Sequence, residues 1–206
     1  LNTLVFEEEL ADAERIAYRL VDAGVDALII QDMAFMRMGL EGVEFHASTQ
    51  TANTTPEGVR FLQESGFSRV ILERGLTLEQ IKEIRRTTTI ELECFVHGAI
   101  CVATSGQCDL SRSINGRSGN RGECAQPCRM TYDLMDGSGN TLLAGRHLLS
   151  ARDLNLSDRI GTLLDAGITS FKIEGRLKDE AYVKNTVSHY RSLLDREIAE
   201  RKDCIR

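Results

Sequence analysis

Four cysteines near the middle of the chain are the residues whose type and spacing most clearly indicate chemistry. They follow the pattern C-x6-C-x15-C-x3-C, as Cys101, Cys108, Cys124 and Cys128. Four thiolates are the ligands of an iron-sulfur cluster and also of a structural zinc ion. Structural zinc usually has two closely spaced pairs, and only Cys124 and Cys128 form one, so the spacing favours an iron-sulfur cluster over zinc.

The surroundings of these cysteines support a ligand role over the alternative, which is that they are small buried hydrophobes. Residues 98–128 are rich in Gly, Ser and Arg and have no regular hydrophobic period. Nearby cations could offset the charge of thiolates or bind a phosphate: Arg112, Arg117, Arg121 and Arg129. The remaining cysteines, Cys94 in a predicted strand and Cys204 in the tail, are assigned to the core and to no function.

Short apolar segments alternate with segments of helical period along most of the chain. Strands are predicted at residues 3–6, 26–32, 43–49, 69–73, 90–96 and 170–175. A helix is predicted after each of the first four strands. Two more helices are predicted at 156–167 and 179–201. A hairpin is predicted around Asp136–Asn140. This alternation is typical of parallel strands joined by helical crossovers.

Six such strands fit an open doubly wound sheet or an incomplete (β/α)8 barrel of the TIM type. The barrel is favoured, because no Gly-rich fingerprint follows the first predicted strand. The fold class is therefore α/β, with a Cys-rich insertion and hairpin at 98–150 after a strand. We expect residues 1–206 to form a single domain, as a fragment without its first two βα units, because the chain starts in a strand and lacks an initiator Met.

Composition limits the possible locations and partners. The 206 residues are 42% hydrophobic and carry a net charge of -6, which gives no general attraction to nucleic acid. No apolar run reaches the roughly 18–20 residues that cross a bilayer, and no signal peptide is seen, so a cytoplasmic protein without membrane contact is expected. Reducing conditions there would keep the thiols free for metals or catalysis.

Several motifs together resemble the peptidase U32 family. The longest is Glu93-x-Phe95-x-x-Gly98-Ala99-Ile100-Cys101-x4-Gly106-x-Cys108-x-Leu110-Ser111. Further matching segments are "HASTQ" at 46–50, "RVILERG" at 69–75, "RSGNRGECAQPCR" at 117–129, "LLSARDL" at 148–154 and "FKIEGRLKDEAYV" at 171–183. One position departs from the family: Gly75 stands where a Glu is usual.

The resemblance implies two kinds of activity. The family is named for a collagenase-like protease, but other branches are oxygen-independent hydroxylases with a [4Fe-4S] cluster on four cysteines. Those branches act on a tRNA wobble uridine, a 23S rRNA cytidine or a ubiquinone precursor, and the RNA branches are linked to a prephenate-derived donor. The segment at 117–129 looks closest to the rRNA cytidine branch, which makes RNA the expected partner.

The residues favour the hydroxylase. Neither G-x-S-x-G nor H-E-x-x-H occurs. A Cys/His pair could be His97 with Cys101, but four positions apart on one loop is no evidence of ion-pair geometry, and the cluster needs Cys101. A third alternative is a noncatalytic module with a structural zinc.

Polar residues at the predicted strand ends are the candidates for catalysis and substrate binding. They are His46, Gln50, Arg74, Glu93, His97, Lys172, Glu174 and Arg176. Lys172 and Glu174 are two apart and so lie on one face of a strand. Each has a structural alternative: His46 could line the barrel, Glu93 with Lys172 could form an internal salt bridge, and Arg176 with Lys178 could be solvated.

Overall fold

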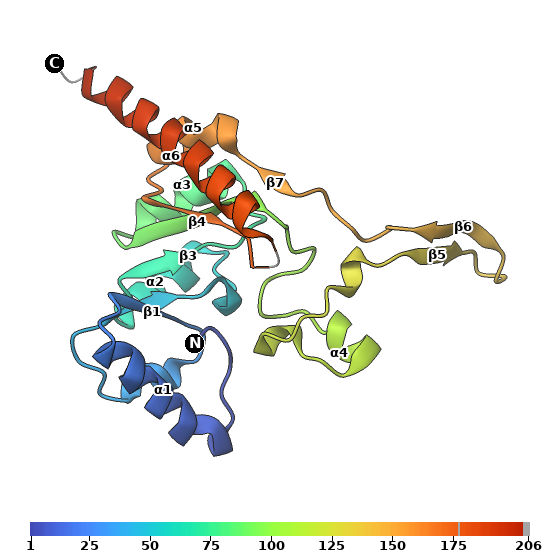
Figure 1. Cartoon of the computed structure of the whole chain (residues 1–206), viewed down its shortest axis with the longest axis horizontal. Helices are drawn as coiled ribbons and strands as arrows, with labels where there is room; N and C mark the ends of the chain where they lie inside the picture. The colour runs from blue at the N-terminus through green and yellow to red at the C-terminus, as the bar shows by residue number, and fades with distance from the viewer. Residues whose placement is uncertain (177, 204–206) are drawn as a thin grey trace. The chain divides into compact units, whose positions relative to one another are not determined.

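The chain divides into two compact units in this computed structural model, which describes residues 1–176 and 178–203 (Figure 1). Unit 1 comprises Leu1–Ala52 and Cys101–Arg152. Unit 2 comprises Asn53–Ile100 and the chain from Asp153 onward. Each unit therefore combines two stretches that are far apart in sequence. Cys204 lies outside the described residues.

Unit 1 begins with a short 3-10 turn and an amphipathic helix. The regular elements are η1 (Glu7–Glu9), α1 (Leu10–Asp22), β1 (Ala27–Ile30), η2 (Met33–Arg37), β2 (Glu44–Ala47) and η3 (Thr49–Thr51). β1 and β2 are parallel, in a register that pairs Ile30 with Ala47. Ile30, Ala47 and Ala17 of α1 are completely buried, and they form part of the apolar core that holds this strand pair.

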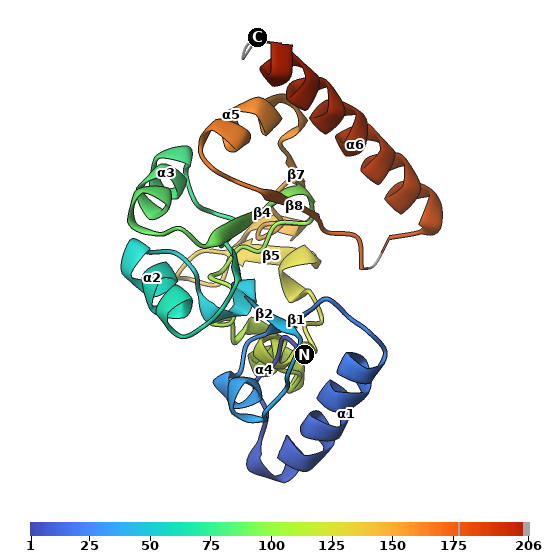
Figure 2. The ribbon, with the colours of Figure 1, turned by 90° about the vertical axis from the view of Figure 1, so that its left-hand side faces the viewer.

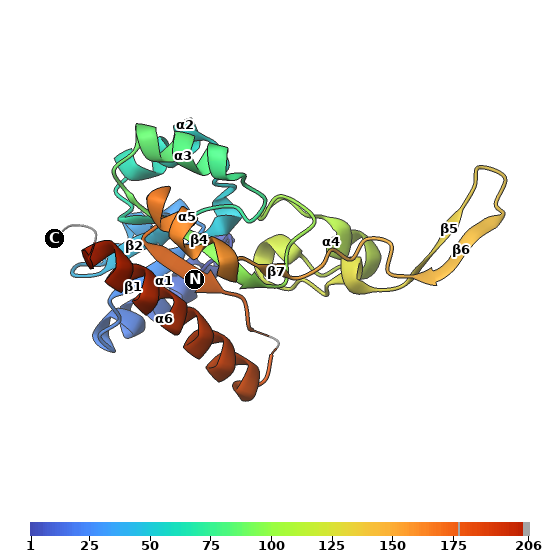
Figure 3. The same cartoon turned by 90° about the horizontal axis from the view of Figure 1, so that it is seen from above.

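The second stretch of unit 1 contains the cysteines and then a hairpin. Its elements are α4 (Leu110–Asn115), η4 (Gly119–Arg121), η5 (Pro127–Arg129), β5 (Tyr132–Met135) and β6 (Thr141–Arg146). β5 and β6 are antiparallel, as predicted, and the Asp136 carboxylate accepts hydrogen bonds from the amides of Ser138 and Asn140 in the turn. Figure 3 shows the hairpin extending from the cysteine-rich part of unit 1 as a two-stranded arm.

The strands of unit 2 are arranged around β4 (Glu91–Gly98). β4 is parallel to β3 (Arg69–Ile71) and to β8 (Ser170–Ile173), and antiparallel to β7 (Leu154–Asn155). Leu92 and Val96 of β4 are completely buried. In this central strand Glu93 and Phe95 are two residues apart and share one face, and the pairing with β8 shifts its register between Phe95 and His97.

Four helices accompany these strands: α2 (Pro56–Glu64), α3 (Leu78–Thr87), α5 (Ile160–Asp165) and α6 (Glu180–Asp203), with η6 (Ser157–Arg159) before α5. The start of α3 is set by a capping box, in which Thr77 and Gln80 satisfy each other's backbone amides. Ile81 and Ile84 of α3 are buried. α2 contacts α3 and α5 contacts α6, as Figure 2 also shows.

The structure confirms a mixed α/β fold with parallel strands, and it differs from the prediction in several short elements, including helix α4 in the segment expected to be irregular. Residues 3–6 form no strand in the part of the chain that is described, whereas β7 was not predicted. Five strands, instead of six, have a parallel neighbour among residues 1–176 and 178–203. Closure into an incomplete barrel stays a prediction. None of the described helices is long and apolar enough to span a membrane.

Candidate functional site

The cysteine-rich segment of unit 1 brings four thiols into electrostatic range of one another. Burial raises the pKa of the Cys128 thiol, the neighbouring Arg129 lowers it, and the thiols of Cys124, Cys101 and Cys108 raise it further. Arg129 also donates a hydrogen bond to the Cys128 sulfur at 3.8 Å. Among the described residues, no three His, Cys, Asp or Glu side chains form a group that could hold a metal ion as they stand.

Local hydrogen bonds hold the loops that carry these thiols. The Cys108 amide donates to the Asn120 side-chain oxygen at 2.9 Å, and the Ala125 amide donates to the Ser111 hydroxyl at 3.1 Å. At Gly119 a Cβ would lie 3.8 Å from the Cys124 sulfur, so the backbone passes close to this thiol. A [4Fe-4S] cluster takes four thiolate ligands, and the four thiols do not form such a group as they stand, so the cluster stays a prediction.

Gln50 connects the end of β2 to the cysteine-rich segment. Its side-chain amide donates to the Gly119 carbonyl at 3.5 Å, and its own carbonyl accepts from the Gln31 side chain at 3.3 Å. Gly106 has a φ of +81°, and a Cβ there would overlap the Gln50 carbonyl oxygen. Only glycine allows this close approach. Gln50, predicted from its position at a strand end, therefore lies against the segment that carries the thiols.

His46 is buried in β2, and its Nε2 lies 3.6 Å from a carboxylate oxygen of Glu44. The two side chains are two residues apart and share a face of the strand. The structural alternative for His46, a hydrogen-bonded histidine that lines a barrel, stays a prediction together with the closure of the barrel.

Arg121 binds the N-terminal segment of unit 1. Its guanidinium forms an ion pair with Glu9 at 2.6 Å, donates to the Leu4 carbonyl at 2.9 Å and lies 3.9 Å from the centre of the Phe6 ring. These contacts also account for residues 3–6, which are held by side chains instead of a strand ladder. The predicted role of Arg121, beside thiolates or a phosphate, is therefore replaced by a structural one, whereas Arg129 does lie beside a thiol.

Three of the predicted polar residues meet around one aromatic ring in unit 2. The Arg74 guanidinium lies 3.8 Å from the centre of the Phe95 ring and pairs with Glu174 at 3.3 Å. The Lys172 ammonium lies 5.7 Å from the same ring centre. Arg74 Nε is buried and has no hydrogen-bond partner among the described residues. We call Arg74, Phe95, Lys172 and Glu174 the Phe95 cluster.

Glu93 is the centre of a buried ionic network. Its carboxylate lies 3.1 Å from Lys172 Nζ and 3.5 Å from an Arg69 nitrogen, and it accepts a hydrogen bond from the Ser170 hydroxyl at 2.7 Å. The residue is only 7% exposed. The internal salt bridge between Glu93 and Lys172, the structural alternative for these residues, is therefore present, and Glu93 also pairs with Arg69.

His97 lies between two tyrosines of α6. Its Nδ1 is 3.2 Å from the Tyr190 hydroxyl, and its ring centre is 5.9 Å from that of Tyr182. Arg176 is exposed at the end of β8, and its backbone amide donates to the Glu174 carboxylate at 3.2 Å. Its side chain is not brought to the Phe95 cluster by any contact in the described residues, in agreement with the solvated alternative.

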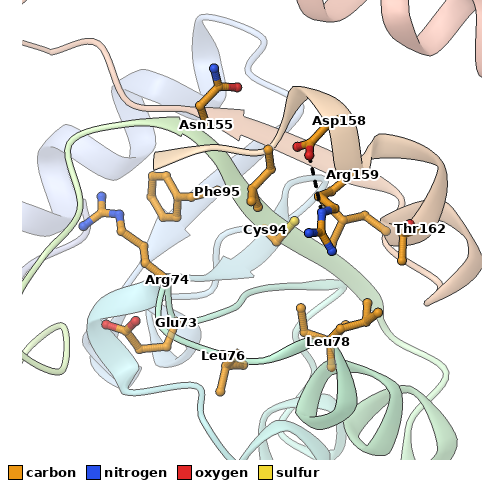
Figure 4. Close-up of a pocket in the computed structure, with 13 residues that line it drawn as sticks. Glu73, Arg74, Leu76, Leu78, Cys94, Phe95, Asn155, Asp158, Arg159 and Thr162 are labelled. Atoms are coloured by element: carbon orange, nitrogen blue, oxygen red, sulfur yellow. Dashed lines mark ion pairs between the residues drawn. The ribbon is translucent and has the colours of Figure 1, made fainter. Parts of the chain in front are cut away.

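A pocket of about 360 Å³ lies within unit 2, between residues of α3, β4, β7 and α5. Figure 4 shows Arg74 beside Phe95 on one side of it and Asp158 paired with Arg159 on another. Cys94 lines this pocket, and burial together with the nearby Glu93 charge raises the pKa of its thiol to about 12. Because the thiolate is the nucleophilic form, Cys94 is an inert core residue, as predicted.

Sequence reasoning missed the partners that organise these sites. Phe95 was seen only as part of a motif, and Tyr190, Asn120 and Gln31 were not selected at all. Phe95 lies two residues from Glu93 and two from His97, and alternate residues of a strand share a face. This spacing could have indicated that Phe95 belongs with the candidate site residues. Tyr190 offered only the weak signal of an aromatic residue with a polar tip in a helix.

With this geometry described, comparison with known proteins identifies the family. Residues 1–205 match the family described as Peptidase family U32, and the chain belongs to it. It is 47% identical over 206 residues to the 23S rRNA 5-hydroxycytidine C2501 synthase of Escherichia coli K12, covering 100% of this chain and 32% of that protein.

Two further relatives carry different names. An uncharacterized protease of Methanocaldococcus jannaschii is 42% identical over 204 residues, covering 94% of this chain and 50% of that protein. The tRNA hydroxylation protein P1 of Bacillus subtilis 168 is 37% identical over 208 residues, covering 97% and 49%. This chain thus spans 32% to 50% of the length of these three relatives.

Proposed function

We propose that this protein takes part in the hydroxylation of RNA, with rRNA cytidine as the first substrate to test and tRNA uridine as the second. The single observation that carries the proposal is the 47% identity to an rRNA hydroxycytidine synthase, which extends over the whole of this chain and includes the four-cysteine segment. A relative named for tRNA hydroxylation supports the same reaction type.

The four thiols of unit 1 are the proposed ligands of a [4Fe-4S] cluster. Their position in one Gly- and Arg-rich segment supports this assignment, together with the electrostatic effect of Cys101, Cys108 and Cys124 on the Cys128 thiol, whose pKa they raise. Such a cluster would supply electron transfer for an oxygen-independent hydroxylation, with a prephenate-derived oxygen donor. Gln50 would hold the loop at Gly119, and Arg129 would offset part of the thiolate charge at Cys128.

The Phe95 cluster of unit 2 is the proposed contact surface for the RNA. The Phe95 ring is only 5% exposed and carries the Arg74 guanidinium, so the part of this cluster that would attract an RNA phosphate is its two cations, each of which also pairs with a carboxylate. The buried Arg74 Nε without a partner leaves a donor that a substrate oxygen would satisfy. Because Glu174 already pairs with Arg74, substrate binding would compete with this ion pair or share the guanidinium with it.

A peptidase is the second candidate, since one relative is named as a protease. A cysteine peptidase needs a thiol whose pKa is lowered. Burial raises the pKa of the Cys94 thiol and of the Cys128 thiol, which argues against either of these two residues as a peptidase nucleophile.

Two measurements test the proposal. Anaerobically purified protein should contain about four iron and four sulfide per chain, and Cys124→Ala should lose most of the iron whereas Cys94→Ala should keep it. Mass spectrometry of rRNA and tRNA should then show a hydroxylated nucleoside that is lost on gene deletion and restored by the wild-type gene but not by Cys124→Ala.

The outcomes separate the candidates. Colourless protein with one zinc per chain and unchanged RNA would leave the noncatalytic zinc module. Cleavage of casein or collagen that disappears in Cys101→Ala would favour the peptidase. Iron-sulfur protein with unchanged rRNA and tRNA would overturn RNA as the substrate.

A further inference from the structure

The Tyr190 hydroxyl is the meeting point of three polar groups in unit 2. Tyr190 is 3% exposed, and its oxygen lies 2.8 Å from the Val96 carbonyl oxygen, 3.2 Å from Asn155 Oδ1 and 3.2 Å from His97 Nδ1. Burial raises the pKa of this phenol, which keeps its proton in place at neutral pH. All three contacts therefore have to be shared by a neutral hydroxyl group.

The number of donors and acceptors on each group determines which of them donates each hydrogen bond. A phenol has one proton to donate, and its oxygen can also accept. The Val96 carbonyl can only accept, and it is the nearest of the three groups. Asn155 Oδ1 also accepts from the Ser157 amide at 3.1 Å, which identifies it as the amide oxygen and a second pure acceptor. The phenol proton thus belongs to one of these two oxygens, and none remains for His97.

A bond between Tyr190 and His97 is consequently possible only if the imidazole is the donor. In a neutral imidazole one nitrogen carries the proton and the other has a free lone pair. The proton must be on Nδ1, so Nε2 is the acceptor. Within the described part of the chain, the contacts of His97 include no hydrogen bond at Nε2. The rings of Tyr182 and Tyr190 lie 5.9 Å and 5.5 Å from the imidazole and restrict its orientation.

We propose that Tyr190 is a positioning residue that holds His97 in the Nδ1–H tautomer, so that Nε2 presents a lone pair to a hydroxyl, water or amide donor of the substrate. The tautomer follows from the contacts of unit 2, whereas its use in a reaction rests on the proposed function. Tyr190 acts through His97 and would not touch the substrate itself.

Nuclear magnetic resonance of the two imidazole nitrogens tests the tautomer directly. The wild-type protein, labelled with ¹⁵N and assigned with His97→Gln, should show at pH 8 a protonated Nδ1 and an unprotonated Nε2 for His97. Tyr190→Phe removes the hydroxyl that accepts this proton and should shift His97 toward the Nε2–H form. Tyr182→Phe is the matched control, because it also removes a hydroxyl beside this ring but no bond to the imidazole, and it should keep the wild-type pattern.

The results distinguish this proposal from the proposed function. A wild-type spectrum with the proton on Nε2 overturns it, even if Tyr190→Phe fails to fold. An unchanged tautomer in folded Tyr190→Phe overturns it as well. In deletion cells, Tyr190→Phe should lower the hydroxylated nucleoside about tenfold, which is less than the roughly 100- to 10,000-fold effect of losing a general acid or base, because Tyr190 acts only through His97. If RNA from cells with Tyr190→Phe is fully modified, the positioning role is refuted but RNA hydroxylation is not. If RNA from cells with the wild-type gene is unmodified, RNA hydroxylation is refuted, and the spectrum still decides the tautomer.

Discussion

Neutralising Glu93 should destabilise the protein far more than neutralising its neighbour on the same strand. Glu93→Gln keeps the shape of the side chain but leaves Lys172 without its carboxylate partner at 3.1 Å and Arg69 without the contact at 3.5 Å. Removing one member of a buried pair costs about 3–5 kcal/mol. The Lys172 and Arg69 side chains are 30% and 28% exposed, so water offsets part of this cost. We expect a loss of about 2 kcal/mol.

Glu91→Gln is the matched control. Glu91 also pairs with Arg69, at 2.6 Å, but its side chain is 53% exposed, and exposed pairs contribute at most about 1 kcal/mol. A loss of about 2 kcal/mol lowers the melting temperature of a protein of this size by about 4–8 °C. Urea denaturation followed by circular dichroism measures both variants.

A double-mutant cycle separates the ion pair from other effects of the substitution. Lys172→Met should cost about 1–2 kcal/mol less in the Glu93→Gln background than in the wild type, because the partner charge is already gone. Equal stability of Glu93→Gln and Glu91→Gln, or strict additivity in the cycle, would refute the network as described.

Three further predictions concern individual residues. Gly106→Ala should cost about 3 kcal/mol and Gly122→Ala about 1 kcal/mol. Both glycines have a φ of +81°, but only Gly106 faces a carbonyl oxygen, so equal urea midpoints would argue against that contact. Cys94, with a pKa of about 12, is ionised in roughly one molecule in ten thousand at pH 8, so iodoacetamide should label it only after unfolding; a labelled native peptide in mass spectrometry would contradict its burial. Arg121→Gln should speed amide hydrogen exchange in residues 4–9, which its guanidinium binds. Unchanged exchange there would show that other contacts hold this segment.

The helices and buried strands could be predicted because their signals are local. The helical spacing around Ile81 and Ile84, and the Thr77 cap before them, are written in a dozen consecutive residues. Residues 3–6 have the same apolar composition as a strand but are bound by side chains, including that of Arg121, from a part of the sequence more than 100 residues away. β7 is only two residues long, which is too short for any periodic pattern.

The candidate site divides in the same way. The four cysteines were found because their chemistry and spacing are visible in sequence, and the polar residues at strand ends because parallel strands bring such ends together. The sequence did not indicate which of these polar residues form ion pairs or hydrogen bonds with one another. Glu93 and Lys172 come from strands separated by about 80 residues, and the Tyr190 contact to His97 depends on the path of α6. Such pairings are products of tertiary packing.

The arm formed by β5 and β6 offers a practical opportunity for labelling. Its turn, residues 136–140, is exposed, and the bonds that shape it stay within the turn itself. Loop tips of this kind accept inserted sequence with little loss of stability. A short affinity epitope or a fluorophore attached at Ser138 would report on the protein in a cell extract while leaving the sulfur-bearing loops and the strand-end side chains chemically untouched.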